Sequence, residues 1–294
     1  MIKKIVIAGG TGFIGKYFKY KFQSLGYEMF IISRQEPHIQ WQDKGGIVAA
    51  LENSEMLINL AGKSVDCRYT EMNRSEILLS RTRTTQALGE AILQCTNPPQ
   101  LWINSSTATI YRHAEDRSMT EDTGEIGTGF SVNVAKSWEQ SFFNFQLSKT
   151  RQVALRTAIV LGKNGGAIKP LKNLVRFGIG GKQGNGKQMF SWIHIEDVFN
   201  IVLFLQSKNN LEGVFNCSSP NPIDNNTLMK SFREKMKMKI GLPSPKWLLE
   251  AGAVFIRTET ELVLKSRWVV PGRLLKEGYS FKFPFIDPAL KNLL

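Results

Sequence analysis

Cysteine is scarce in this chain, and its three copies are dispersed. Cys67, Cys95 and Cys217 are the only cysteines among 294 residues. Such a set forms no disulfide framework, so we expect a reducing compartment, of which the cytoplasm is the default. No group of His, Cys or carboxylate residues has the spacing of a metal site, and the sequence therefore predicts no bound metal.

Long hydrophobic runs are also missing. The longest apolar run, Ile201–Leu205, is much shorter than a membrane-spanning helix. Near the N-terminus only Ile5–Ala8 are apolar before glycines begin, which is too short for the hydrophobic region of a signal peptide. We therefore expect neither a membrane partner nor export.

Acidic residues are outnumbered by basic ones, 25 against 38, which gives a formal net charge of +13. A basic surface suits nucleic acid, a membrane or an anionic small molecule. The densest lysine cluster, Lys230–Lys239, contains Glu234 and lacks the interleaved aromatic residues of a single-strand binder. We interpret it as a solvated helix face and expect no nucleic-acid partner, with an anionic partner as the alternative.

What the chain does have, at its very start, is a glycine turn between a strand and a helix. The apolar run Ile5–Ile7 leads into Ala8–Gly15, which reads AGGTGFIG, and an amphipathic stretch follows. Glycines there let backbone approach a pyrophosphate, and the helix N-terminus offers free N–H groups. The turn is thus predicted to bind a dinucleotide through Gly9, Thr11, Gly12, Phe13, Ile14 and Gly15.

Strand and helix patterns alternate along the rest of the chain, which predicts a doubly wound parallel sheet of the Rossmann type, an α/β fold. The expected strands are Lys4–Ile7, Glu28–Ile32, Met56–Leu60, Leu101–Asn104, Val153–Arg156 and Val214–Cys217. The expected helices are Gly12–Leu25, Ser75–Gln94, Val132–Phe145 and Asp197–Gln206.

After about residue 160, glycine-rich connections and prolines interrupt the pattern. We predict a smaller C-terminal α+β lobe there, with the chain returning once to the main sheet around Trp192–Gln206. The cofactor-binding domain would then comprise residues 1–163 and about 191–206. The substrate-side lobe would comprise 164–190 and 207–294.

Two further segments predict how a cofactor is bound. The second strand ends in Ser33 and Arg34, where NAD-binding folds place an acidic residue for the ribose 2′-hydroxyl. An arginine and a hydroxyl instead suit a 2′-phosphate, so we predict NADP(H). At the end of the next strand, the segment Leu60, Ala61 and Gly62 contains small residues that let the backbone lie against the adenosine side of the cofactor. The alternative is a simple tight turn between the strand and the following loop.

The hydroxyl-rich run Asn104–Tyr111 resembles that of the extended short-chain dehydrogenase/reductases, and specifically of nucleotide-sugar epimerases. In that register Thr107 falls on the catalytic Ser/Thr. The family also uses a Tyr four residues before a Lys, where the Lys lowers the pKa of the Tyr acid/base and binds the nicotinamide ribose. Here Lys136 fits the lysine, but Val132 stands where the Tyr belongs, so the usual mechanism cannot run unchanged.

End to end, the chain resembles the atypical extended members known as epimerase family proteins. The matching segments include Lys136–Glu139, Arg156–Gly162, Ser191–Ile195 and Val270–Pro284. This resemblance implies an NADP-binding Rossmann domain, a small lobe over the nicotinamide, Val160 beside the cofactor, and an unsettled substrate.

Other polar residues remain open in their roles. Arg81 and Glu76, on the helix after Gly62, either reach the cofactor or are solvated helix charges. Asp197 is predicted to cap the following helix, and His194 to stabilise the lobe junction rather than transfer protons. Tyr111 and His194 are outside candidates for the missing acid. Trp138 and Glu139 are interpreted as packing or pairing residues.

Together these features favour an NADP(H)-dependent oxidoreductase or epimerase-type enzyme that acts on an unidentified small molecule. The alternative is a protein that binds NADPH without turnover and signals through partners. We expect a monomer or a homodimer.

Overall fold

The structure, a computed structural model, describes residues 3–163, 165–245 and 265–294. Its centre is a six-stranded sheet in which every neighbouring pair is parallel. In spatial order the strands are β10 (Gly213–Cys217), β5 (Arg151–Thr157), β4 (Leu101–Thr107), β3 (Met56–Asn59), β1 (Lys4–Ala8) and β2 (Glu28–Ile32). The predicted Rossmann fold is therefore confirmed.

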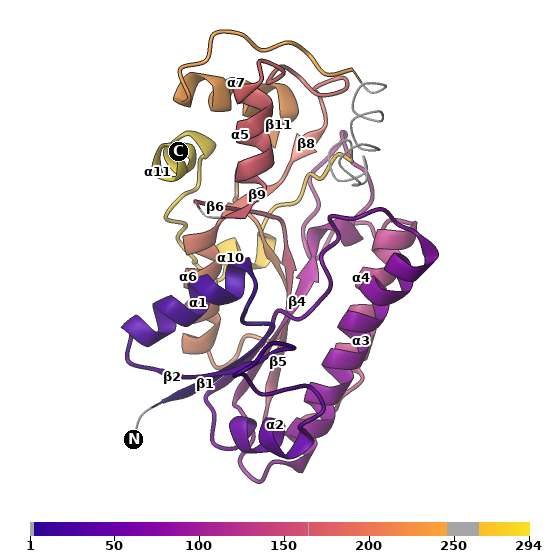
Figure 1. Ribbon diagram of the computed structural model, residues 1–294, viewed down its shortest axis with the longest axis vertical. Coiled ribbons are helices and arrows are strands. Elements are labelled where there is room, and N and C mark those ends of the chain that lie inside the picture. The colour runs from indigo at the N-terminus through magenta and orange to yellow at the C-terminus, as the bar shows by residue number, and fades with distance from the viewer. Residues whose placement is uncertain (1–2, 164, 246–264) are drawn as a thin grey trace.

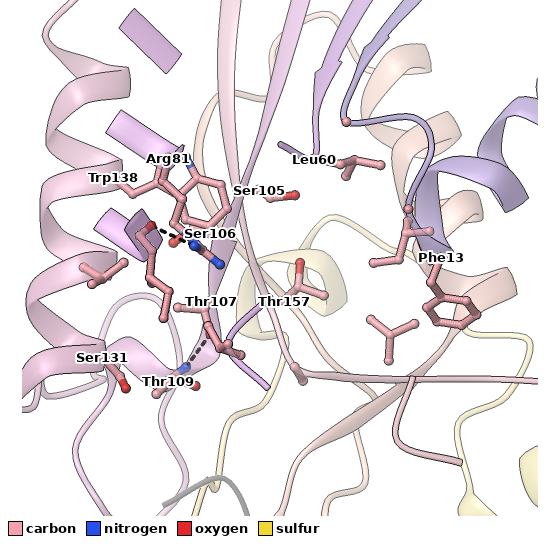
Figure 2. A pocket seen from close by; sticks show the side chains of 18 of the residues that line it. Phe13, Leu60, Arg81, Ser105, Ser106, Thr107, Thr109, Ser131, Trp138 and Thr157 are labelled. Carbon is pink, nitrogen blue, oxygen red and sulfur yellow. Dashed lines mark hydrogen bonds between the residues drawn. The ribbon is translucent and has the colours of Figure 1, made fainter. Parts of the chain in front are cut away.

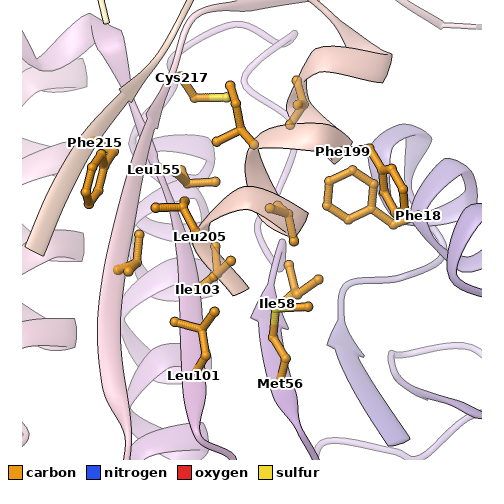
Figure 3. Close-up of a cluster of buried hydrophobic side chains, with 14 of the residues drawn as sticks. Phe18, Met56, Ile58, Leu101, Ile103, Leu155, Phe199, Leu205, Phe215 and Cys217 are labelled. Atoms are coloured by element: carbon orange, nitrogen blue, oxygen red, sulfur yellow. The ribbon is translucent and has the colours of Figure 1, made fainter. Parts of the chain in front are cut away.

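Helices cover both faces of this sheet (Figure 1). Helices α1 (Phe13–Ser24) and α6 (Ile195–Ser207) supply the aromatic and aliphatic side chains that pack on one face. Figure 3 shows Phe18 and Phe199 meeting in this cluster beside the buried residues of β3, β4 and β5. Helices α2 (Lys44–Leu51), α3 (Glu71–Gln94) and α4 (Phe130–Phe143) cover the other face.

The helix ends follow local chemistry. Helix α3 begins four residues before the predicted start, because the Thr70 side chain accepts a hydrogen bond from the Asn73 N–H and caps it there. Helix α1 ends at Ser24, two residues before Gly26, whose φ of +83° is the left-handed conformation that glycine adopts most readily. Helix α2 has no counterpart among the predicted helices.

A second, smaller group of elements lies beyond the carboxyl ends of the strands, at the top of Figure 1. Its core is made by α5 (Ile168–Arg176), α7 (Asn225–Lys235) and α11 (Ile286–Leu293). Two small sheets complete it, one of β7 (Gly165–Gly166), β6 (Ile159–Gly162) and β9 (Trp192–His194), the other of β8 (Met189–Phe190) and β11 (Ile223–Asp224). The short helix α10 (Gly272–Lys276) packs against β10 through Arg273, whose guanidinium lies 4.0 Å from the Phe215 ring.

The predicted return of the chain to the main sheet takes a different form in the structure. The segment Trp192–Gln206 returns to the main sheet by packing and not as a strand of it, since β9 pairs with β6 while Ile193 and α6 pack on the central strands. The strand that does return is β10, which pairs with β5 although it falls inside 207–294, the range assigned to the lobe. Residues 164 and 246–264 of the predicted lobe lie outside the described residues, and the domain limits stay a prediction.

Candidate functional site

A pocket of about 390 Å³ opens at the carboxyl ends of the central strands, between α1 on one side and α3 and α4 on the other (Figure 2). Ligands of doubly wound sheets bind at this edge. Twenty-one residues line it: Gly9, Gly12, Phe13, Ile14, Gly15, Leu60, Val65, Tyr69, Ile77, Arg81, Ser105, Ser106, Thr107, Thr109, Phe130, Ser131, Val134, Trp138, Thr157, Ala158 and Val160.

The three motif glycines are glycines for different reasons. A Cβ on Gly9, whose φ is +77°, would lie 2.7 Å from the Ala61 backbone nitrogen, and one on Gly15 would lie 2.5 Å from the Gly10 Cα. Among the described residues, a Cβ on Gly12 would meet only the Gly9 carbonyl oxygen, at 3.6 Å. Packing of the protein therefore demands the first and third glycines, whereas Gly12 faces open space in the pocket.

The N-terminus of α1 is available to an anion. Gly12 caps the helix without a side-chain hydrogen bond, and the first turn carries no acidic residue. Phe13 and Ile14, the first helical residues, line the pocket beside it. Exposed N–H groups and the positive end of the helix dipole thus point at the cavity. Thr11 lies in the turn but does not line the pocket.

Ser33 and Arg34 lie outside the enclosed cavity, next to the glycine turn. A backbone hydrogen bond joins this segment to the glycine turn, since the Gly9 N–H donates to the carbonyl of Ile32, the residue before Ser33. The buried Ser33 hydroxyl is engaged with the backbone of Gln35. Arg34 is exposed, and no carboxylate lies within ion-pair distance of it in the described part of the chain.

At the end of β3, the backbone is fixed by a buried amide network. Leu60 lines the pocket, and the Ala61 N–H donates to the Asn59 side chain at 3.0 Å. Asn59 in turn donates to Asn104 at 2.7 Å and to Thr85 at 3.1 Å. The Trp138 indole N–H donates to the same Thr85 hydroxyl at 3.1 Å, so strands β3 and β4 and helices α3 and α4 are tied together behind the pocket.

The end of β4 presents hydroxyl groups. The Thr107 oxygen accepts from the Thr109 N–H at 3.1 Å. Its own hydrogen has no acceptor among the described residues and can be donated to a ligand in the pocket. The neighbouring Ser106 hydroxyl donates to Glu139 at 2.6 Å, and Glu139 forms a buried ion pair with Arg156 at 2.8 Å. Glu139 is therefore a pairing residue, as the sequence indicated.

Helix α4 departs from the predicted register. Its pocket-lining residues are Phe130, Ser131, Val134 and Trp138, which follow helical spacing. Val132 is only 1% exposed and packs in a hydrophobic cluster with Ala108 and Tyr111, and Lys136 is exposed to solvent. At 100° per residue, Lys136 lies about 160–200° around the helix from Val134 and Trp138. The structure therefore does not bring Lys136, or the position expected for the Tyr, into the pocket.

Arg81 reaches the pocket from α3, whereas Glu76 does not. The Arg81 guanidinium donates to the Ile77 carbonyl at 2.8 Å and stacks 5.1 Å from the Trp138 ring centroid. Burial lowers the pKa of Arg81 to about 10. Glu76 is exposed and forms an ion pair with Lys63.

Neither outside candidate for the acid lines the pocket. The Tyr111 hydroxyl is buried, donates to Asn216 at 2.9 Å and accepts from Arg156 at 2.9 Å; burial raises the pKa of Tyr111. His194 stacks on Phe283, with ring centroids 3.9 Å apart, and its Nε2 lies 3.1 Å from the side-chain oxygen of Asn292. It thus sits at the junction with the C-terminal helix.

The prediction that Asp197 caps α6 is wrong. His194 itself is the N-cap, because its Nδ1 accepts from the Glu196 N–H at 3.1 Å. Asp197 lies inside the first turn, buried, and its carboxylate accepts from the backbone N–H groups of Lys282 and Phe283. It connects α6 to the C-terminal segment instead of capping the helix.

Sequence reasoning missed several lining residues. Val65, Tyr69, Phe130, Ser131, Val134, Thr157 and Ala158 were not singled out. The only available signal was the spacing of Phe130, Val134 and Trp138 along one helix face. Among the described lining residues, Tyr69 and Arg81 are the only titratable ones, and none is a carboxylate, His, Cys or Lys.

Comparison with known proteins fits this architecture. The family of NAD dependent epimerases/dehydratases matches residues 5–218, and a domain of unknown function, DUF1731, matches residues 244–293. The chain belongs to the NAD dependent epimerase/dehydratase family. Human epimerase family protein SDR39U1 is 30% identical over 296 residues, 99% of each chain. An epimerase family protein of Staphylococcus aureus is 28% identical over 302 residues, 100% of this chain and 99% of its own length.

Solved structures agree. The crystal structure of human SDR39U1 (isoform 2) with NADPH superposes on this epimerase-family chain with a TM-score of 0.90 and 31% identity, and covers 99% of this chain and 98% of its own. A nucleoside-diphosphate sugar epimerase from Corynebacterium glutamicum gives a TM-score of 0.80 at 25% identity, covering 100% of this chain and 58% of its own. The resemblance to atypical extended short-chain dehydrogenase/reductases is confirmed. Within the described residues, no helix combines the length and apolar character needed to cross a membrane.

Proposed function

We propose that this protein binds NADP(H) and is an oxidoreductase for a small molecule, in a reducing compartment such as the cytoplasm, as a monomer or homodimer. The observation that carries the cofactor assignment is made at Gly12, which lines the pocket. An added Cβ there would come no closer than 3.6 Å to the neighbouring part of the chain that the structure describes. A glycine that packing does not require indicates a ligand at that point. The human relative solved with NADPH supports the same reading.

The residues present fit the cofactor. The N-terminus of α1 suits a pyrophosphate, and Arg34, which follows β2 between Ser33 and Gln35, suits a 2′-phosphate. Leu60, which follows β3, and Val160, which lies in β6, would contact it. When bound, NADPH supplies a hydride; the Thr107 hydroxyl would donate a hydrogen bond to the reacting oxygen of the substrate.

Calorimetric titration with NADPH and NADH tests the proposal. Gly12→Ala should weaken NADPH binding at least tenfold and leave the circular dichroism unchanged, because the added methyl group fits the protein but fills ligand space. The control is Gly45→Ala in α2, where the new Cβ would have its nearest described neighbour, the Asp43 carboxylate, at 4.0 Å. Arg34→Ala should lower the affinity for NADPH about ten- to a hundredfold and change the affinity for NADH little. Equal affinity of the wild type for both cofactors would contradict the NADP(H) assignment.

A non-catalytic NADPH-binding protein is the second candidate. It is favoured by the absence of any carboxylate, His, Cys or Lys among the described pocket residues, and by the solvent position of Lys136. The two candidates differ in one measurement. The measurement is NADPH oxidation in the presence of a panel of 2-oxo acids and aldehydes. Stoichiometric oxidation that is lost in Thr107→Ala supports the enzyme. Tight NADPH binding with no NADPH oxidation by any compound of the panel supports the non-catalytic protein.

A further inference from the structure

The loops that follow α5 and α7 meet at the end of the small lobe, at the top of Figure 1, and expose three large apolar side chains. Phe177, directly after α5, is 80% exposed, and Ile240 and Leu242, after α7, are 65% and 61% exposed. The two loops are neighbours, because the Leu242 N–H donates to the Gly178 carbonyl at 2.8 Å. None of these side chains lines the pocket. Apolar side chains that gather in solvent mark an interaction surface.

The backbone holds this exposed arrangement in place. Gly178, with a φ of +74°, turns the chain after α5 in the left-handed conformation that glycine adopts most readily. The Gly181 N–H donates to the Leu242 carbonyl at 3.0 Å. The Arg233 guanidinium, which comes from α7, donates to the Gly180 carbonyl. The two loops are thus joined to each other and to α7, so the apolar side chains belong to a well-defined surface.

The same surface is strongly basic. Residues 165–190 contain five basic and no acidic residues, and residues 235–245 contain three basic and no acidic ones. Arg176 and Lys239, which adjoin the apolar side chains in the chain, are both exposed, and no described carboxylate lies within ion-pair distance of either. Glu234, the acidic residue that precedes the second segment, lies 3.9 Å from a lysine of its own helix. The cations around the apolar side chains are therefore available to an anionic partner.

Phe177, Ile240, Leu242, Arg176 and Lys239 form what we call the basic apolar face. A bilayer with anionic headgroups offers both complements to it, hydrocarbon for the projecting side chains and negative charge for the cations. A second copy of this chain would instead place like charges opposite one another. Phe177 is the only aromatic residue of the face, so the face offers nucleic acid no row of stacking platforms.

We propose that the basic apolar face docks reversibly on a membrane surface that contains anionic lipid. The three apolar side chains enter the boundary between headgroups and acyl chains, and the cations beside them contact the headgroups. The expectation of no membrane partner was based on the lack of a spanning segment, which a peripheral contact does not need. The net charge of +13 adds a long-range attraction to such a surface. The proposal is independent of the proposed function, because the face shares no residue with the pocket.

The experiment measures co-flotation of the whole chain with vesicles of two compositions. One is phosphatidylcholine alone, and the other is equal parts of phosphatidylcholine and phosphatidylserine. Wild type should float with the second and not with the first. Phe177→Ser/Ile240→Ser should weaken this binding at least about tenfold, because it removes the inserted apolar groups. Arg176→Gln/Lys239→Gln should weaken it about thirtyfold, because it removes two cations at the lipid surface.

Matched controls make the same chemical changes elsewhere on the surface. Tyr20→Ser removes an aromatic ring of α1 that is 70% exposed, and Lys44→Gln/Lys276→Gln removes two exposed cations of α2 and α10. Both should float as wild type does. Phe177→Trp, which keeps an aromatic side chain at the face, should also bind, and its tryptophan emission should shift to the blue when the serine-containing vesicles are added. Urea unfolding should give the wild-type stability for every variant, because all the changed residues are exposed.

Three results would overturn the proposal. Wild type could float with neither vesicle, or Phe177→Ser/Ile240→Ser could float as well as wild type. The control Lys44→Gln/Lys276→Gln could lose as much binding as Arg176→Gln/Lys239→Gln, which would show that net charge acts without this face. Polyglutamate and a single-stranded oligonucleotide are titrated in parallel. Binding of either one by a protein that does not float with vesicles would assign the face to an acidic protein or to nucleic acid instead.

Discussion

At the scale of single residues, the role of a side chain on α4 depends on whether it faces the pocket or the hydrophobic core. Val132 and Ser131 are neighbours on α4, yet Ser131 lines the pocket and Val132 packs beside Ala108 and Tyr111. Val132, the residue at the position of the family's catalytic Tyr, is thus a core residue and does not face the pocket. A polar ring added at residue 132 would enter the hydrophobic core, where it has no room.

We therefore expect Val132→Tyr to lower the free energy of unfolding by about 1–3 kcal/mol through overpacking, and to confer no epimerase activity. Ser131→Tyr, which enlarges the pocket-facing neighbour instead, should cost less stability. Urea denaturation followed by circular dichroism compares the two. A Val132→Tyr protein as stable as wild type would contradict the burial of this position.

At the scale of elements, α6 illustrates how one helix connects the sheet to the C-terminal segment. Its hydrophobic face packs on the central strands, whereas its first turn is fixed by His194 and Asp197. Burial lowers the pKa of His194, although the nearby Asp197 and Glu196 favour its charged form and Lys282 opposes it. The neutral imidazole is the form that accepts from the Glu196 N–H.

This makes stability depend on pH with a definite sign. The folded pKa of His194 lies below its ordinary value of 6.5, so the unfolded chain binds more protons just below pH 6.5. The contribution of His194 is full above pH 6.5 and falls as the pH drops toward the folded pKa. His194→Asn, which keeps an N-cap acceptor, should lose less stability than wild type between pH 7.5 and 5.5 in urea titrations. Equal losses would show that His194 does not titrate in this way.

At the scale of the whole molecule, a buried polar chain runs from the pocket to the C-terminal segment. Ser106 donates to Glu139, Glu139 pairs with Arg156, and Arg156 donates to Tyr111. Tyr111 then donates to Asn216 on β10, whose amide donates to the Val270 carbonyl. Elements distant in sequence are thereby fixed relative to the pocket floor.

Arg156→Met should lower the free energy of unfolding by about 3–5 kcal/mol, because it leaves the Glu139 carboxylate buried without its partner. Both side chains of the pair are only 11% exposed. The double variant Arg156→Met/Glu139→Gln should recover part of that loss, since it removes the stranded charge. Chemical denaturation of the single and double variants measures this. A double variant less stable than the single one would contradict the argument.

Features that depend only on neighbouring residues can be predicted from the order of the amino acids. The glycine turn, the alternation of strands and helices, the hydroxyl run at the end of β4 and the basic residue after β2 are each read from a few consecutive positions, because turn geometry, periodicity and strand ends are local. The orientation of α4, the position of β10 beside β5 and the entry of Arg81 into the pocket follow only from long-range packing. Those depend on which faces pack against segments far away in the chain, so Lys136 points to solvent and Trp138 and Arg81 meet inside, although the helical spacing allows either arrangement.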